Sequence, residues 1–82
     1  MGSARQGMGR RIKSLRVERG LTQSGLARKT GLNRTYLSGV ENGMRNVSID
    51  NLVRIAQGLD VTLFFLTNGI DTEYSGKHEG KR

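Results

Sequence analysis

Arginine and lysine are the side chains of this sequence with the most evident chemistry, and they are unevenly placed. Residues 1–54 hold eleven of them against three acidic residues, whereas residues 55–82 hold three against four. A concentration of positive charge attracts polyanions, because neutralising phosphates supplies most of the nonspecific affinity of proteins for duplex DNA. The basic part of the chain therefore predicts a nucleic-acid-binding surface, although an ordinary solvated surface could carry the same charge.

Among the basic residues the arginines have the most specific chemistry, and Arg34 is the candidate base reader because of its place in the helix-turn-helix described below. Its planar guanidinium is a fork of donors that matches the O6 and N7 acceptors of guanine in the major groove. The same fork fits the oxygens of a phosphate, so base reading and backbone contact both remain open for Arg34. Thr35 beside it could contact a thymine methyl group or a phosphate.

Catalysis by a nucleophile with a base, or by a metal ion, finds no support in the sequence. The chain has no cysteine, and its one histidine, His78, has no cluster of carboxylates around it. Two N-glycosylation sequons, at Asn33 and Asn46, are attributed to chance because nothing suggests a secretory route. We expect no enzyme, no metal and no cofactor.

Five helices are predicted to position the polar side chains. Apolar residues recur at spacings of three and four, and no proline interrupts them. The expected N-caps are Thr22, Asn33, Ser48 and Thr62, and the expected stops are Gly20, Gly31, Gly43 and Gly69. The broadest apolar stripe, on the fourth helix, is formed by Ile49, Leu52, Val53, Ile55, Ala56 and Leu59. Residues 61–66 have strand-like composition but no strand to pair with, so a short fifth helix and an all-α fold are expected.

One compact domain is predicted over residues 8–70. Residues 1–7 are interpreted as a flexible start or a cloning remnant, and residues 71–82 as a mobile polar tail. A domain of this size buries only about 60% of the surface of its unfolded chain, so a partner subunit would help to stabilise it. The sequence has no segment suited to span a membrane or to act as a signal peptide, and no separate sensor domain. A soluble, cytoplasmic protein without a small-molecule effector is therefore expected.

The predicted second and third helices, with Gly31 between them, have the lengths of a helix-turn-helix that runs from Gln23 to Asn42. The segment GLTQSGLARKTGLNRTYLSGVENGMRNVSIDNLVRIAQGLDV resembles the lambda-repressor-like, or Xre-type, helix-turn-helix family, over roughly residues 8–67. More narrowly, LNRTYLSGVENGMRNVSIDNL resembles the controller proteins of bacterial restriction-modification systems.

The resemblance implies which residues contact DNA. The implied base-reading side chains are Asn33, Arg34, Thr35, Ser38 and Asn42, and the implied backbone contacts are Gln23, Tyr36, Arg45 and Asn46. The spacing of residues 34, 35 and 38 agrees, since they share an outward face of a helix. For Tyr36 an ordinary half-buried packing role is an equal alternative. The basic residues of the first helix, Arg10, Arg11, Lys13 and Arg16, are interpreted as steering charge, with at most one of them in contact with DNA.

A dimer interface is predicted at Leu63, Phe64, Phe65 and Leu66, because one short helix cannot bury all four side chains. Some are expected to point inward and the rest to cross a twofold axis. The resemblance implies a homodimer on a palindromic operator, autoregulating an operon that includes an endonuclease gene. Alternatives are a phage-type repressor, the antitoxin of a toxin-antitoxin pair, or a protein-protein adaptor.

Two glycines depart from the usual pattern of the family. Gly25 stands where a helix-favouring residue is more common, and Gly39 exposes backbone on the predicted reading helix. Gly39 is expected either to permit a close approach to DNA or to add flexibility.

Overall fold

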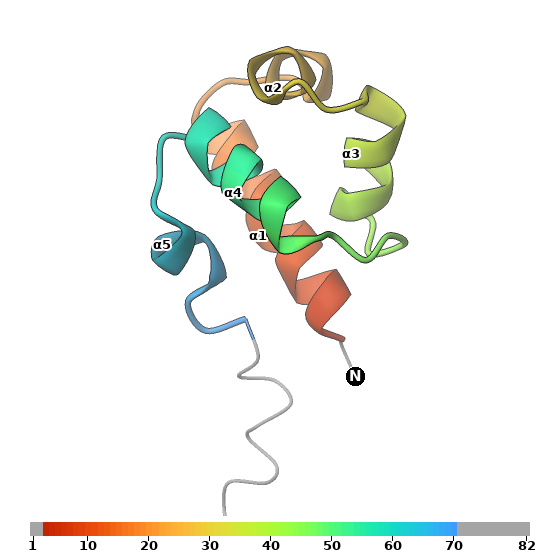
Figure 1. The fold of residues 1–82 in the computed structure, drawn as a ribbon, viewed down its shortest axis with the longest axis vertical. Helices are drawn as coiled ribbons and strands as arrows, with labels where there is room; N and C mark the ends of the chain where they lie inside the picture. Colours follow the sequence, from red (N-terminus) through yellow and green to blue (C-terminus); the bar gives the residue numbers. More distant parts are fainter. Residues whose placement is uncertain (1–2, 71–82) are drawn as a thin grey trace, which may run out of the picture.

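Five α-helices form the part of the chain that this computed structural model describes, residues 3–70 (Figure 1). They are α1 (Ala4–Glu18), α2 (Gln23–Thr30), α3 (Arg34–Glu41), α4 (Ile49–Gly58) and α5 (Leu63–Thr67). The expectation of an all-α fold with five helices is confirmed. The predicted tail, residues 71–82, lies outside the described residues.

Each helix begins at a side chain that accepts a hydrogen bond from the first turn. The predicted caps Thr22, Asn33, Ser48 and Thr62 all do so, which satisfies N–H groups that would otherwise have no partner. Gly31 ends α2 with a φ of 74°, a left-handed conformation that glycine adopts without steric cost. The local signals in the sequence therefore located these helix ends correctly.

The first helix begins at Ala4, before residue 8, where the domain was predicted to begin. Ser3 and Gln6 form a capping box, in which the backbone N–H of each donates to the side chain of the other at 3.2 Å. This reciprocal pair caps α1, so that residues 4–7 are helical in the structure.

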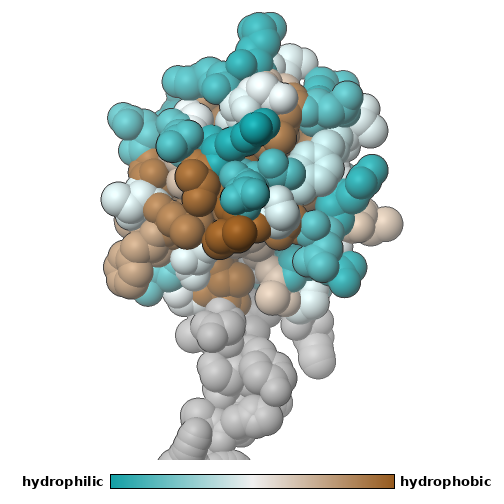
Figure 2. All heavy atoms as spheres, viewed as in Figure 1, coloured by the Kyte–Doolittle hydropathy of each residue, from teal (hydrophilic) through white to brown (hydrophobic). Residues whose placement is uncertain are grey.

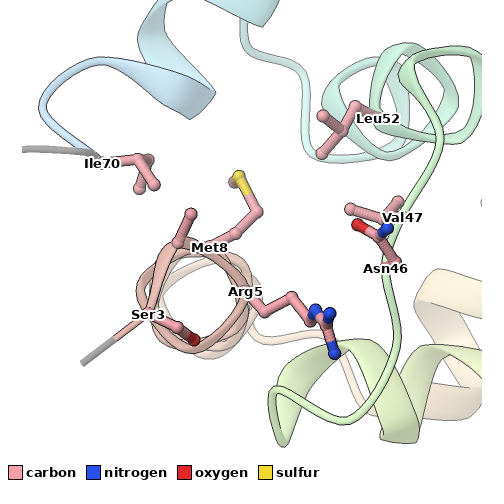
Figure 3. Close-up of a pocket in the computed structure, with 8 residues that line it drawn as sticks. Ser3, Arg5, Met8, Asn46, Val47, Leu52 and Ile70 are labelled. Carbon is pink, nitrogen blue, oxygen red and sulfur yellow. The ribbon is translucent and has the colours of Figure 1, made fainter. Parts of the chain in front are cut away.

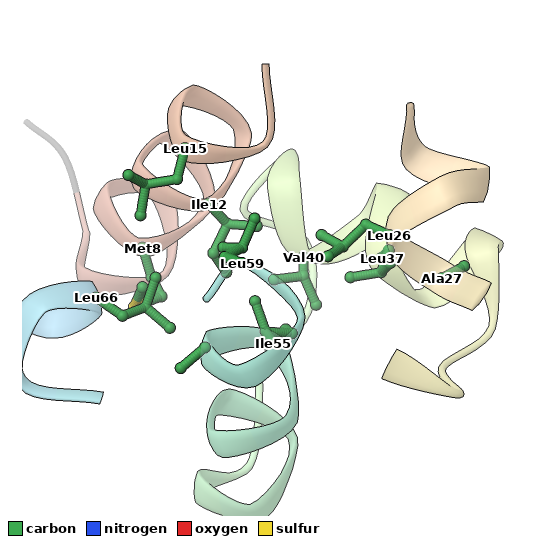
Figure 4. Close-up of a cluster of buried hydrophobic side chains, with 11 residues drawn as sticks. Met8, Ile12, Leu15, Leu26, Ala27, Leu37, Val40, Ile55, Leu59 and Leu66 are labelled. Atoms are coloured by element: carbon green, nitrogen blue, oxygen red, sulfur yellow. The ribbon is translucent and has the colours of Figure 1, made fainter. Parts of the chain in front are cut away.

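The core draws on all five helices and their ends (Figure 4). Its buried apolar side chains are Met8, Ile12, Leu15, Leu26, Ala27, Leu37, Val40, Ile55, Ala56, Leu59 and Leu66. Two members of the stripe predicted on the fourth helix are not among them, since Ile49 is 60% exposed and Val53 37%. The apolar stripe is therefore buried only in part, and α4 makes its main contacts with α2 and α5.

Gly9 lets α1 and α3 approach closely. A Cβ at this position would overlap the backbone carbonyl oxygens of Val40 and Glu41 at the end of α3. Gly7, in the same helix, leaves room for a Cβ, whose nearest neighbour would be the Ile70 carbonyl oxygen at 3.5 Å. The position of α3 on α1 therefore depends on one glycine of the pair.

The two glycines of α1 predict stability changes of opposite sign. Gly9→Ala is expected to lower the free energy of unfolding by about 1–3 kcal/mol, because backbone atoms must move apart. Gly7→Ala is expected to raise it by about 0.5–1 kcal/mol, because alanine favours a helix. Urea denaturation followed by circular dichroism measures both. Equal effects of the two substitutions would contradict the close approach.

Candidate nucleic-acid interface

The outer face of α3 carries a row of polar side chains. Arg34, Thr35 and Asn42 are exposed and Ser38 is half-exposed, whereas Leu37 and Val40 on the opposite face are buried. At about 100° per residue, positions 34, 35, 38 and 42 fall within roughly a quarter to a third of the helix circumference. The structure therefore places four of the predicted base-reading residues on one outward face that the core fixes from behind.

Asn33, the fifth predicted base reader, is also exposed and caps α3. Its Oδ1 accepts hydrogen bonds from the backbone N–H groups of Thr35 at 2.7 Å and Tyr36 at 3.2 Å. The oxygen is thus engaged at the start of the helix. The atom of Asn33 that suits a base contact is its amide nitrogen, a donor.

Tyr36 and Arg45 form one unit beside this row. The Tyr36 ring is half-buried against the core, and its hydroxyl accepts a hydrogen bond from Asn51 Nδ2 at 3.1 Å. The Arg45 guanidinium carbon lies 5.5 Å from the centre of the ring, within the range of a cation–π contact. Tyr36 therefore has the half-buried packing role that was one of its two predicted alternatives. It also supports Arg45, which is predicted to contact the DNA backbone.

Gln23 opens α2 and joins a buried network. Its Nε2 donates to Glu41 Oε1 at 3.1 Å. The Glu41 carboxylate also accepts two bonds from Arg16, at 2.6 Å from Nε and 2.9 Å from Nη2, while Arg16 Nη1 donates to the Leu21 carbonyl oxygen at 2.8 Å. These contacts hold the start of α2, the end of α3 and the last turn of α1 together.

The prediction that Arg16 is a steering charge is therefore wrong. Arg16 is 9% exposed and Glu41 6%. The hydrogen bonds to Glu41 raise the pKa of the Arg16 guanidinium above its ordinary value, so Arg16 stays charged. A sequence signal for the pair existed: Arg16 follows Leu15 by one residue and Ile12 by four, and Glu41 follows Leu37 by four, which puts both charges on or beside buried faces.

Arg11 also has a structural role in place of the predicted steering one. Its guanidinium donates to the carbonyl oxygens of Phe65, Leu66 and Asn68, at 3.0, 3.3 and 2.9 Å. These carbonyls belong to the last turn of α5, where helical acceptors lack partners and a positive charge is favourable. Arg11 thus fixes α5 against α1.

A second exposed surface is apolar. Ile49 and Val53 on α4, together with Phe64 and Phe65 on α5, are large hydrophobic side chains in contact with solvent, and we call them the α4–α5 patch. Figure 2 shows the hydrophobic surface over these two helices. Leu63 is half-buried, whereas Leu66 is fully buried, so its assignment to the interface is corrected: Leu66 belongs to the core of its own subunit.

A shallow groove of about 430 Å³ lies between the start of α1 and the loop after α3 (Figure 3). Met8, Val47, Leu52 and Ile70 form its apolar lining, with Arg5 and Asn46 at its edge. Asn46, predicted to contact the DNA backbone, is exposed here.

Two short helices across a tight turn, the second with an exposed polar row, define a helix-turn-helix DNA-binding module. A family model described as helix-turn-helix matches residues 12–66, and the chain belongs to this family. The family consists of DNA-binding transcription regulators rather than enzymes, so the chain is such a regulator. None of the described helices is long and apolar enough to cross a membrane.

The chain is similar to several controller proteins. Control protein C.MunI of a Mycoplasma species is 46% identical over 66 residues, which span 79% of this chain and 89% of that protein. The restriction-modification controller C.AhdI from Aeromonas hydrophila has a TM-score of 0.73 at 43% identity, over 74% of this chain and 92% of that one. The controller C.Esp1396I, crystallised as a tetramer with its natural 35 base-pair operator, has a TM-score of 0.78 at 36% identity, over 89% and 96%. The narrower resemblance is therefore confirmed.

Proposed function

We propose that the protein is a cytoplasmic, homodimeric controller that binds a palindromic operator and regulates the operon of its own restriction-modification system. The observation that carries the proposal is the outward row of Arg34, Thr35 and Ser38 on α3, backed by buried Leu37 and Val40. A helix supported in this way enters the major groove as one rigid element. The similarity to a controller crystallised on its operator supports the same role.

The backbone contacts flank this row. The N-terminus of α2 presents N–H groups, and Gln23 lies there in contact with Glu41. Arg45 and Asn46 follow α3 and are exposed. These residues would hold phosphates on both sides of the groove that α3 enters, which fixes the register of the reading helix.

The α4–α5 patch supports the homodimer. An exposed cluster of Ile49, Val53, Phe64 and Phe65 is costly in water, and a second copy buries it by presenting the same surface across a twofold axis. Two reading helices in such a dimer would lie about 34–36 Å apart, one turn of B-DNA, which matches a palindromic site.

Substitution of Arg34 tests the reading role. Arg34→Ala is expected to weaken binding to the operator, identified by selecting bound sites from random DNA, by about 1–3 kcal/mol. Binding to unrelated DNA should be nearly preserved, because a base contact discriminates between sequences. Fluorescence anisotropy with both duplexes at several salt concentrations measures this. Arg54→Ala on α4 is the control, since it removes the same charge outside the α3 row. Equal losses on both duplexes would instead make Arg34 a phosphate contact.

A further inference from the structure

Gly39 lies in the interior of α3, a helix of eight residues. Glycine destabilises a helix interior relative to alanine, so its presence on a reading helix needs a reason. The backbone conformation is not that reason, because the described glycines with positive φ are Gly20, Gly31, Gly43 and Gly69. The reason is close packing against another side chain.

Arg45 occupies the space in which a Cβ of residue 39 would lie. That Cβ would be 2.7 Å from Arg45 Cγ, 3.5 Å from Nε and 3.7 Å from Cδ. All three nearest atoms belong to this one side chain, and the closest is in its stem rather than at its flexible end. A side chain at position 39 therefore forces Arg45 to leave its position.

The turn after α3 brings Arg45 back along the helix. Gly43 has a φ of 75°, its N–H donates to the Val40 carbonyl oxygen at 3.1 Å, and the Met44 N–H donates to the Gly39 carbonyl oxygen at 2.8 Å. The chain thus reverses, and the Arg45 stem crosses Gly39 to reach the Tyr36 ring, one helical turn earlier on the same face.

The surface on which Arg45 rests is itself fixed. The hydroxyl of Tyr36 accepts a hydrogen bond from Asn51 on α4, and the Asn51 backbone N–H donates to Ser48, the cap of that helix. The ring is also half-buried against the core. The stem and the head of Arg45 therefore both rest on ordered parts of the protein before any ligand is present.

We propose that Gly39 is a positioning residue that holds Arg45 over Tyr36, ready to contact the DNA backbone. The inference rests on the proposed function, in which Arg45 is a phosphate contact. A surface arginine normally loses side-chain freedom when it binds, and an arginine already ordered loses less. Gly39 thus lowers the stability of α3, but it keeps the Arg45 guanidinium ordered beside the reading face.

A double-mutant cycle tests this proposal with Gly39→Ala, Arg45→Ala and the combined variant. Gly39→Ala is expected to weaken binding about 2- to 12-fold per half-site, equally on operator and unrelated DNA, because an ordered side chain becomes mobile. Arg45→Ala is expected to weaken binding about tenfold and to lower the salt slope by about one. In the Arg45→Ala background, Gly39→Ala should have no further effect.

Gly7→Ala is the matched control, since it gives the same gain in helix propensity in α1, away from Arg45. Gly7→Ala should raise the melting temperature without changing DNA affinity. In the protein without DNA, the NMR signal of Arg45 Hε should carry a ring-current shift from Tyr36 that Gly39→Ala abolishes and Gly7→Ala retains.

Four outcomes would overturn the proposal. Additive losses in the cycle would mean that the methyl group at position 39 clashes with DNA directly. Unchanged affinity of Gly39→Ala, alongside a weakened Arg45→Ala, would remove the positioning role and leave the proposed function intact. Unchanged affinity of Arg45→Ala would remove the phosphate contact as well, and absence of salt-dependent DNA binding by the unsubstituted protein would refute the proposed function itself.

Discussion

Glu41→Ala is expected to lower the free energy of unfolding by about 3–5 kcal/mol, because it leaves the buried Arg16 guanidinium without its partner. The side chain of Glu41 is 1% exposed and that of Arg16 is 11% exposed, so the pair is shielded from water in the intact protein. Gln23 loses its hydrogen-bond acceptor in the same variant. Chemical denaturation at neutral pH measures the change.

Two control variants separate loss of the partner from loss of the pair. Arg16→Met combined with Glu41→Leu removes both charges and fills their volume, and it should recover most of the stability. Glu18→Ala breaks a neighbouring ion pair with Arg19, in which the atoms are 3.6 Å apart and the Glu18 side chain is 66% exposed. That change should cost less than about 1 kcal/mol. A Glu41→Ala variant as stable as Glu18→Ala would show that the network contributes nothing.

Phe64→Asp is expected to convert the protein to a monomer. Phe64 is 74% exposed in the single subunit, and the proposed twofold contact buries it twice, once in each copy. An aromatic contact at the centre of an interface contributes about 2 kcal/mol or more, so loss of two copies should raise the dissociation constant of the dimer roughly 1,000-fold. Sedimentation equilibrium measures that constant directly.

Met44→Asp is the matched control for this substitution. Met44 is also 74% exposed, but it lies in the loop after α3, outside the α4–α5 patch. The same change of apolar side chain to carboxylate there should leave the monomer–dimer equilibrium unchanged. Operator affinity should fall in Phe64→Asp because a monomer contacts a single half-site. A Phe64→Asp protein that stays dimeric would move the interface away from α4 and α5.

Helical periodicity did not predict every buried and exposed side chain of α4 and α5. The composition of residues 63–66 predicted more apolar surface than one subunit can bury, and Phe64 and Phe65 are exposed as expected. Periodicity did not separate Leu66, which is buried, from its neighbours, nor Ile49 and Val53 from the rest of their stripe. Which edge of a stripe is buried depends on the helices packed against it, and their position is not a local property.

The sequence by itself determined the helix ends and the polar row of α3. Thr22, Asn33, Ser48 and Thr62 act on N–H groups two or three residues away, and the alternation of residues 34–42 follows the helical repeat. Tertiary structure alone decided the partners of Arg11, Arg16 and Gln23 and the space that Gly39 leaves for Arg45. Arg16 and Glu41 are 25 residues apart, and such a pair forms only where the packing of α3 on α1, with Gly9 between them, brings two charges out of water together. Local hydrogen bonds determine where each helix begins and ends, whereas burial determines which of its side chains remain exposed for binding.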